Sequence, residues 1–226
     1  MNRYNKVQKQ FFQNASHELK TPLMSISGYA EGIRDGVLEG ERAAKGLDII
    51  VSESSRMNKI VTEMTLLAKL DSEENSFQPT EVTIKDLITE TIERMHPLLT
   101  TKELELQVEY PDQDHTKLAV YADRDKLLQA LLNVVSNGAR YARQTITIDI
   151  QLKKDNIHLI VLDDGPGIAE ELIPFLFHRF MKGKDGDTGL GLAIARAIVE
   201  RCGGLISAVN RKDGGAEIAI QLPGAV

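Results

Sequence analysis

Residues 11–23 have the sequence FFQNASHELKTPL, and they lie inside an amphipathic pattern that decides the fold of the first third of the chain. Apolar residues recur there at spacings of three and four, which places them on one face of a long helix. The stripe consists of Val7, Phe11, Ala15, Leu19, Leu23, Ile26, Ala30 and Ile33. Gly36 and Gly40 interrupt the pattern and predict a turn over residues 35–40. A second stripe, from Leu47 to Ala68, completes an antiparallel helical hairpin over residues 1–70.

A hairpin of this kind buries only part of its apolar surface by itself. Pairing of two copies into a dimeric four-helix bundle would cover the remainder, so we expect a homodimer. The periodicity alone favours a plainer interpretation, in which the hairpin is a packing element or a dimerisation stalk without chemistry.

The chain changes character at residues 71–77, an acidic and polar stretch that we interpret as a linker. Beyond it, residues 78–226 alternate between helical and strand patterns. Helices are predicted at 83–100, 126–141 and 190–202, and strands at 104–110, 146–153, 157–163, 205–210 and 217–222. The fold class is therefore α plus α/β, with the hairpin followed by a two-layer α/β sandwich whose helices cover one face of a mixed sheet.

The composition is that of a soluble globular protein, with 42% hydrophobic and 27% charged residues. A formal net charge of -6 argues against a nucleic-acid-binding surface, which normally carries a basic excess. Cys202 is the single cysteine, which excludes an internal disulfide framework and fits a reducing compartment. No apolar run approaches the roughly 20 residues that cross a bilayer, and residues 1–10 do not form a signal peptide.

Three motifs of the second domain carry chemistry in a fixed order. Asn133 and Asn137 lie one helical turn apart, and carboxamide oxygens are hard, neutral ligands that suit Mg²⁺. Asp163 follows an apolar strand and stands beside glycines, where a carboxylate can accept a hydrogen bond from an exocyclic amine of a flat ring. The stretch from Thr188 to Leu192 opens a helix whose exposed amides could bind an anion.

Between the glycine-rich stretches lies a polar segment of about 20 residues, which is long for a loop without a function. It contains Phe177, Arg179, Phe180, Lys182 and Lys184. Cations concentrated in an otherwise acidic chain suggest a lid over phosphates. Both the dinucleotide-binding glycine pattern and the P-loop pattern are absent from the sequence.

Taken together, these motifs resemble the histidine kinases of two-component signalling over essentially the whole chain. Residues 11–23 resemble the H box of that family almost letter for letter. Asn133 and Asn137 resemble its N box, and Asp163, Gly165 and Gly167 its first glycine box. Phe177 and Phe180 resemble the F box, and residues 188–191 the second glycine box. The resemblance implies that the second domain has the GHKL-type ATP-binding fold shared with DNA gyrase, heat-shock chaperones and mismatch-repair ATPases.

By this resemblance, His17 is the phosphoryl acceptor, and Glu18 is the acidic residue that orients and deprotonates it. An imidazole with an ordinary pKa of about 6.5 is largely neutral near pH 7, as a nucleophile must be. Consecutive helical residues point about 100° apart, so Glu18 either needs a favourable rotamer to reach the ring or acts across the site on other groups. Thr21 lies at the i+4 position on the same face, where the family positions water for hydrolysis of a phospho-aspartate. The alternative for Thr21 is a local bond to a backbone group before Pro22.

The resemblance also assigns the nucleotide site, with ATP and Mg²⁺ as its ligands. Asn137 is the first choice for Mg²⁺, with Asn133 as a second ligand or its orienter. Arg140 would reach a phosphate, Tyr141 would pack on the adenine and Asp163 would bind its amino group. The remaining expected nucleotide-binding residues are Gly165, Gly167, Ile168, Arg179, Phe180, Lys182, Thr188, Gly189, Leu190, Gly191 and Leu192.

Two residues depart from the family pattern. Asp187 stands where a glycine often precedes Thr188, and we expect its carboxylate to point away from the phosphates. Cys202 stands where a histidine is frequent, and we expect a small buried thiol at a helix end. Asp164, next to the adenine-binding Asp163, is expected to face solvent.

The resemblance implies ATP-dependent autophosphorylation of His17 and phosphotransfer to an aspartate of a response regulator receiver domain, with phosphatase activity toward that regulator. It also implies that the chain is the cytoplasmic portion of a membrane-anchored sensor. An ATPase or chaperone module of the same superfamily is one alternative, but those proteins lack the upstream His-Glu-x-x-Thr-Pro hairpin. A second alternative is a degenerate dimeric scaffold, against which the retention of His17, Asn137, Asp163 and Gly189 argues. The hand of the connection at residues 35–40 decides whether transfer runs within or between protomers.

Overall fold

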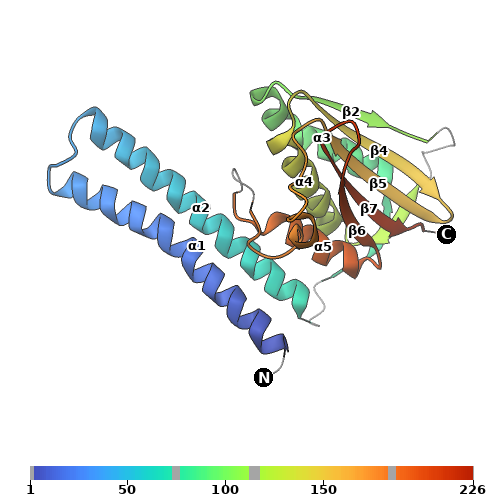
Figure 1. Cartoon of the computed structure of the whole chain (residues 1–226), viewed down its shortest axis with the longest axis horizontal. Coiled ribbons are helices and arrows are strands. Elements are labelled where there is room, and N and C mark those ends of the chain that lie inside the picture. The colour runs from blue at the N-terminus through green and yellow to red at the C-terminus, as the bar shows by residue number, and fades with distance from the viewer. Residues whose placement is uncertain (1–2, 73–76, 112–117, 183–186, 226) are drawn as a thin grey trace.

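The structure, a computed structural model of the chain, describes residues 3–72, 77–111, 118–182 and 187–225. Its first part is the predicted hairpin, in which α1 (Arg3–Arg34) and α2 (Glu41–Asp71) lie side by side and antiparallel (Figure 1). The connection contains Gly36 and Gly40, both at positive φ, which a glycine adopts without strain. α1 continues through Pro22 as a single helix. None of the described helices is long and apolar enough to span a membrane.

The second part is built on a mixed five-stranded sheet. Its strands, in spatial order, are β2 (Glu105–Glu109), β4 (Thr145–Lys153), β5 (Asn156–Asp163), β7 (Ala216–Pro223) and β6 (Leu205–Asn210). β2 pairs with β4 in parallel, and the other three pairs are antiparallel. β5 lies at the centre, which brings its last residue, Asp163, to the end of the sheet beside Ile146 of β4.

Helices cover one face of this sheet, as predicted. They are α3 (Ile84–Thr101), α4 (Arg124–Tyr141) and α5 (Gly191–Arg201), and α4 and α5 lie on the side of the sheet toward the hairpin (Figure 1). Fully buried side chains such as Leu131 of α4 and Leu159 of β5 fill the space between the layers. A short 3₁₀ helix, η2 (Ile173–Phe175), interrupts the segment between β5 and α5.

A second, two-stranded sheet was absent from the sequence prediction. It pairs β1 (Thr80–Thr83) with β3 (Ala119–Ala122) in antiparallel fashion. Val82, Val120 and Ala122 of this sheet are buried in the main core.

The hairpin does not stand apart from the second domain. Leu67 and Leu70, near the end of α2, are buried in the same hydrophobic core as α4 and α5. The Arg201 guanidinium at the end of α5 also donates to the carbonyl oxygen of Ser72. Residues 73–76 of the predicted linker lie outside the described residues. The end of α2 is therefore one wall of the second domain, which positions other α2 side chains toward its cavity.

Candidate functional site

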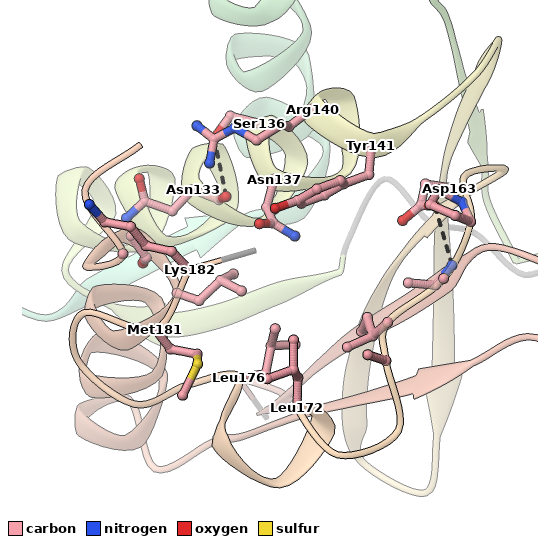
Figure 2. A pocket seen from close by; sticks show the side chains of 18 of the residues that line it. Asn133, Ser136, Asn137, Arg140, Tyr141, Asp163, Leu172, Leu176, Met181 and Lys182 are labelled. Carbon is pink, nitrogen blue, oxygen red and sulfur yellow. Dashed lines mark hydrogen bonds between the residues drawn. The ribbon is translucent and has the colours of Figure 1, made fainter. Parts of the chain in front are cut away.

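A cavity of about 400 Å³ lies between α4, the end of β5 and the start of α5 (Figure 2). Most of the residues expected to bind a nucleotide line it. These are Asn133, Asn137, Arg140, Tyr141, Asp163, Gly167, Ile168, Lys182, Gly189, Gly191 and Leu192. The remaining lining residues include apolar ones that the sequence did not single out: Leu172, Leu176 and Met181. The cavity thus combines a polar helix face with an apolar floor, as an adenine nucleotide requires.

α4 forms the polar wall of the cavity. Its apolar face is buried in the hydrophobic core, so its polar side chains face the cavity. Its N-cap is Asp123, which accepts from the backbone N–H of Lys126 at 3.2 Å. The Nδ2 of Asn133 donates to the carbonyl oxygen of Gly191 at 3.0 Å and so ties α4 to the first residue of α5. The side chain of Asn137 makes no hydrogen bond within the described part of the chain, and it lines the cavity next to Tyr141 (Figure 2).

The residues present fit a magnesium ion that arrives with phosphates. Among the described residues, no group of three or more His, Cys, Asp or Glu side chains could hold a metal by itself. Asn137 and Asn133 instead offer neutral carboxamide oxygens at the cavity wall. Mg²⁺ commonly takes one or two protein oxygens and completes its shell with waters and phosphate oxygens.

Asp163 ends β5 at the opposite side of the cavity and is only 6% exposed. Its Oδ1 accepts from the backbone N–H groups of Gly165 at 2.9 Å and Ala216 at 3.2 Å. Burial, the largest effect, raises the pKa of the Asp163 carboxyl. The two hydrogen bonds act in the opposite direction, but the pKa stays above its ordinary value. Its Oδ2 makes no hydrogen bond in the described chain, which leaves an acceptor for a ligand.

The glycines of the first glycine stretch are required by close packing. A Cβ at Gly165 would collide with the carbonyl oxygen of Tyr141 and would lie 2.9 Å from Oδ1 of Asp163. Gly167 has a φ of 81°, and a Cβ there would lie 2.8 Å from Oδ1 of Asn210. The Asn210 side chain holds this loop by two hydrogen bonds of 2.7 Å. Its Oδ1 accepts from the backbone N–H of Ile168, and its Nδ2 donates to the carbonyl oxygen of the same residue. Nothing in the sequence pattern had pointed to Asn210.

Asp164 is partly exposed, and its carboxylate also has a structural role that the sequence did not predict. Its carboxylate accepts from the backbone N–H groups of Arg143 at 2.7 Å, Gln144 at 3.0 Å and Thr145 at 3.1 Å. Partial burial acts to raise the pKa of Asp164, but these bonds outweigh it and hold the pKa below its ordinary value. Asp164 therefore fastens the connection between α4 and β4 to the end of β5.

We expect Asp164→Ala to destabilise the domain by about 1.5–3 kcal/mol at neutral pH, because three backbone donors lose a charged acceptor. A carboxyl whose folded pKa is lowered stabilises the fold above its unfolded pKa, and this stability is lost as the pH falls through the folded pKa. The difference between parent and variant in urea denaturation should therefore shrink below about pH 4. Asp48→Ala, at an exposed position of α2, is the control and should change stability little.

The second glycine stretch leads into α5. Thr188 is 3% exposed, and its hydroxyl accepts from the backbone N–H of Leu190 at 3.2 Å. Gly189 has a φ of 71°, and a Cβ there would lie 2.8–2.9 Å from the backbone of Phe180 and from Lys182. Thr188 and Leu190 are buried behind the cavity wall, whereas Gly191, the first residue of α5, lines the cavity. The N-terminus of α5 thus faces the space that phosphates would occupy.

The cations expected to touch phosphates are held by the hairpin. The Arg179 guanidinium binds the carboxylate of Asp71 at 2.6 Å and lies 5.1 Å from the ring centre of Phe11. Lys182 lines the cavity, but its Nζ binds the carboxylate of Glu18. Phe180 packs on Phe11 with ring centres 5.5 Å apart. Phe177 is half-buried against the domain core, and Lys184 lies outside the described residues. The phosphate-binding role of Arg179 stays a prediction.

The candidate phosphotransfer residues lie on α1. His17 is exposed. Glu18 pairs with Lys182 and lies 3.7 Å from Arg56 of α2, and it makes no hydrogen bond to His17 in the described chain. The Thr21 hydroxyl donates to the carbonyl oxygen of His17 over a long 3.4 Å and is otherwise exposed. The roles of Glu18 and Thr21 stay predictions.

The two departures from the pattern have defined places. Asp187 does not line the cavity and pairs instead with Lys59 of α2. Cys202 follows the last residue of α5 and is half-buried, and burial raises the pKa of its thiol to about 11. This thiol stays protonated at neutral pH, so it is a poor nucleophile.

Comparisons with known proteins agree with this architecture. Residues 7–73 match the family described as "His Kinase A (phospho-acceptor) domain", and residues 122–226 match "Histidine kinase-, DNA gyrase B-, and HSP90-like ATPase". The chain is 30% identical to the solved catalytic domain of histidine kinase ThkA, which covers 65% of this chain and 95% of that one with a TM-score of 0.58. It is also 32% identical over 95% of its length to the sensor histidine kinase WalK of Bacillus subtilis. The chain belongs to the sensor histidine kinase family.

Further relatives extend the likeness to both domains of the chain. A structure of ThkA in complex with response regulator protein TrrA covers 98% of this chain and 63% of that one, at 26% identity and a TM-score of 0.81. The sensor protein SrrB of Staphylococcus aureus is 32% identical over 96% of this chain. The chain spans only 36% of the length of WalK and 38% of SrrB.

Proposed function

We propose that the chain is a kinase core that binds Mg-ATP in the cavity, phosphorylates His17 and passes the phosphoryl group to an aspartate of a response regulator. The observation that carries the proposal is the joint placement of Asn137, Asp163 and the start of α5 around one cavity. The same chain displays an exposed His17 on α1, and the neighbouring Glu18 already contacts Lys182 of the cavity wall.

Each wall of the cavity has a task in this proposal. The free oxygen of Asp163 accepts from the adenine amino group, and Tyr141 and the apolar floor hold the ring. Arg140 and Lys182 place positive charge beside the phosphates. Asn137 and Asn133 would hold Mg²⁺, which when bound neutralises charge on the phosphate oxygens. Phosphoryl transfer demands mainly positioning and charge neutralisation, and these residues supply both.

At His17, an unprotonated ring nitrogen forms a bond to the γ-phosphorus while the bond from that phosphorus to the β–γ bridging oxygen breaks, and ADP leaves. Glu18 is proposed to orient the imidazole and to take its proton. Because Lys182 now holds the Glu18 carboxylate, that ion pair must open before Glu18 can turn to His17. Release of Lys182 toward the phosphates would accomplish both changes at once.

The partners follow from the surface of the hairpin and from the relatives. Leu23, Met24, Leu47 and Val51 on α1 and α2 are each more than half exposed. Pairing with a second copy would cover them, so we propose a homodimeric four-helix bundle. The ThkA structure contains a response regulator, and we propose the same class of partner for this chain. Because the curated relatives are longer proteins named sensors, we further propose that this chain is the cytoplasmic portion of a membrane-anchored sensor.

The test is incubation of the chain with γ-labelled ATP and Mg²⁺, followed by acid and base treatment of the labelled protein. A phosphohistidine is acid-labile and base-stable, and its label should pass to a cognate receiver domain. Release of labelled inorganic phosphate without labelled protein would instead indicate an ATPase module. Absence of both products would indicate a scaffold without catalysis.

Thr21 gives the proposal a second, separable prediction. Because its exposed hydroxyl is only weakly bonded, it can hold a water for attack on the phospho-aspartate of the partner. We expect Thr21→Ala to keep His17 labelling but to slow dephosphorylation of the response regulator by up to about 100-fold, the size of effect of a reactant that is misplaced by about 1 Å.

Thr65→Ala on α2 is the matched control, because the Thr65 hydroxyl makes the same bond to the carbonyl four residues back, at 2.8 Å to Val61. Label loss from the phosphorylated partner should be followed with parent, variant and control. Coincident decay curves for Thr21→Ala and parent, with normal His17 labelling, would remove Thr21 from the phosphatase reaction.

A further inference from the structure

Two side chains of α2 reach into the nucleotide cavity, although they lie far from its motifs in the sequence. Lys59 and Glu63, one helical turn apart, both line it. Lys59 is paired with Asp187, the residue that departs from the family glycine. Glu63 is only 9% exposed, so its carboxylate is among the few buried charged groups of the described chain.

The Glu63 carboxylate accepts a hydrogen bond from the hydroxyl of Thr188. The same hydroxyl accepts from the N–H of Leu190, so its donor and one of its two acceptor lone pairs are used. Gly189 and Gly191, on either side of Leu190, line the cavity, and Gly191 is tied to Asn133. Glu63 therefore holds the stretch whose amides face the phosphate end of the site.

The cations near Glu63 do not fully balance the negative charge of its carboxylate. Burial, the largest effect, raises the pKa of its carboxyl, and Asp187 adds to the rise, whereas Thr188, Lys59 and Arg140 act in the opposite direction. Lys59 is shared with Asp187, and Arg140 is the residue proposed to meet a phosphate. Each phosphate that enters adds negative charge next to a carboxylate in a partly dehydrated wall, where charges interact strongly.

We infer that Glu63 is a specificity-determining residue of the nucleotide site, which lowers affinity more as the bound adenine compound carries more phosphates. The inference rests on the proposed ATP site. Repulsion between the Glu63 carboxylate and the phosphates would set the Glu63–Thr188 contact against full binding of a triphosphate. Contact of α2 with the glycine stretch and ATP affinity are therefore linked, and each must weaken the other by the same factor.

The experiment is titration calorimetry of the intact chain and of Glu63→Gln with adenosine, ADP and ATP in the presence of Mg²⁺. Glutamine keeps the shape and can still accept from Thr188, but it removes the charge. We expect ATP to bind about fivefold or more tighter to the variant, ADP to gain less and adenosine to stay within about twofold. Glu63→Ala removes the same charge and serves as a second variant in case glutamine disturbs the fold. Its gains in affinity should follow the same order, with ATP first, ADP second and adenosine last.

Glu41→Gln is the matched control, because it makes the same change in charge at an exposed position at the far end of α2. Its three affinities should equal those of the parent. If Glu63→Gln changed the affinities for adenosine, ADP and ATP by the same factor, Glu63 would act only through packing, and the inference would be overturned. Weaker ATP binding by the variant would overturn it as well. Failure of all variants and the parent to bind any of the three compounds would instead refute the proposed ATP site itself.

Discussion

Replacement of His17 with glutamine is expected to abolish autophosphorylation while ATP affinity stays within about twofold of the parent. The glutamine side chain has no nitrogen that can attack phosphorus at neutral pH, so the acceptor is lost completely. His17 is exposed on α1 and does not line the cavity, so its replacement leaves every proposed nucleotide contact in place. The measurement pairs transfer of label from γ-labelled ATP with calorimetric titration of the same preparation.

His96→Gln is the matched control, because His96 is exposed on α3 and belongs to no proposed site. It should be labelled like the parent. Label of equal amount in His17→Gln and parent would place the acceptor elsewhere. A parallel loss of ATP affinity in His17→Gln would mean that the hairpin contributes to nucleotide binding through this residue.

The sequence predicted the main elements of the fold because their signals are local. The helical period of the hairpin and the alternation in β4 and β5 each appear within a window of about 18 residues. The pairing of β1 with β3 escaped prediction because each strand has only four residues and its partner lies far away in the chain. Such short strands form only because the surrounding core buries residues such as Val82 and Val120.

In the candidate site, too, residues within local motifs were predicted, whereas residues defined by long-range contacts were not. Asn137 and the glycine stretches carry their chemistry in adjacent residues, so the pattern could identify them. The structural role of Asp164 escaped prediction because its partners, the N–H groups of residues 143–145, approach it only in the folded sheet. Glu63 lies 125 residues from Thr188 on an ordinary charged helix face, and no local pattern distinguishes it. Contacts between the hairpin and the second domain form only in the tertiary structure, so no local sequence pattern predicts them.

Replacement of Asp163 with asparagine should weaken ATP binding by about 1.5–3 kcal/mol, or about 10- to 150-fold, if the adenine amino group binds there. The Oδ1 of Asp163 is fixed by two backbone donors, so the oxygen of an asparagine should take that place. Its amide nitrogen then replaces the free carboxylate oxygen at the cavity. A hydrogen-bond donor would oppose the donor of the adenine amino group, which adds to the loss of charge.

The reversal of donor and acceptor gives a sharper test than affinity alone. Inosine triphosphate carries a carbonyl oxygen where ATP carries the amino group, so it should bind the Asp163→Asn variant better, relative to ATP, than it binds the parent. Asp164→Asn, which alters the neighbouring carboxylate away from the cavity, should leave the ratio of the two affinities unchanged. A ratio that is equal in Asp163→Asn and parent would show that Asp163 does not contact the six-position of the base. A general loss of folding would lower both affinities together, so the change in ratio isolates the contact from the structural bonds that Asp163 also makes.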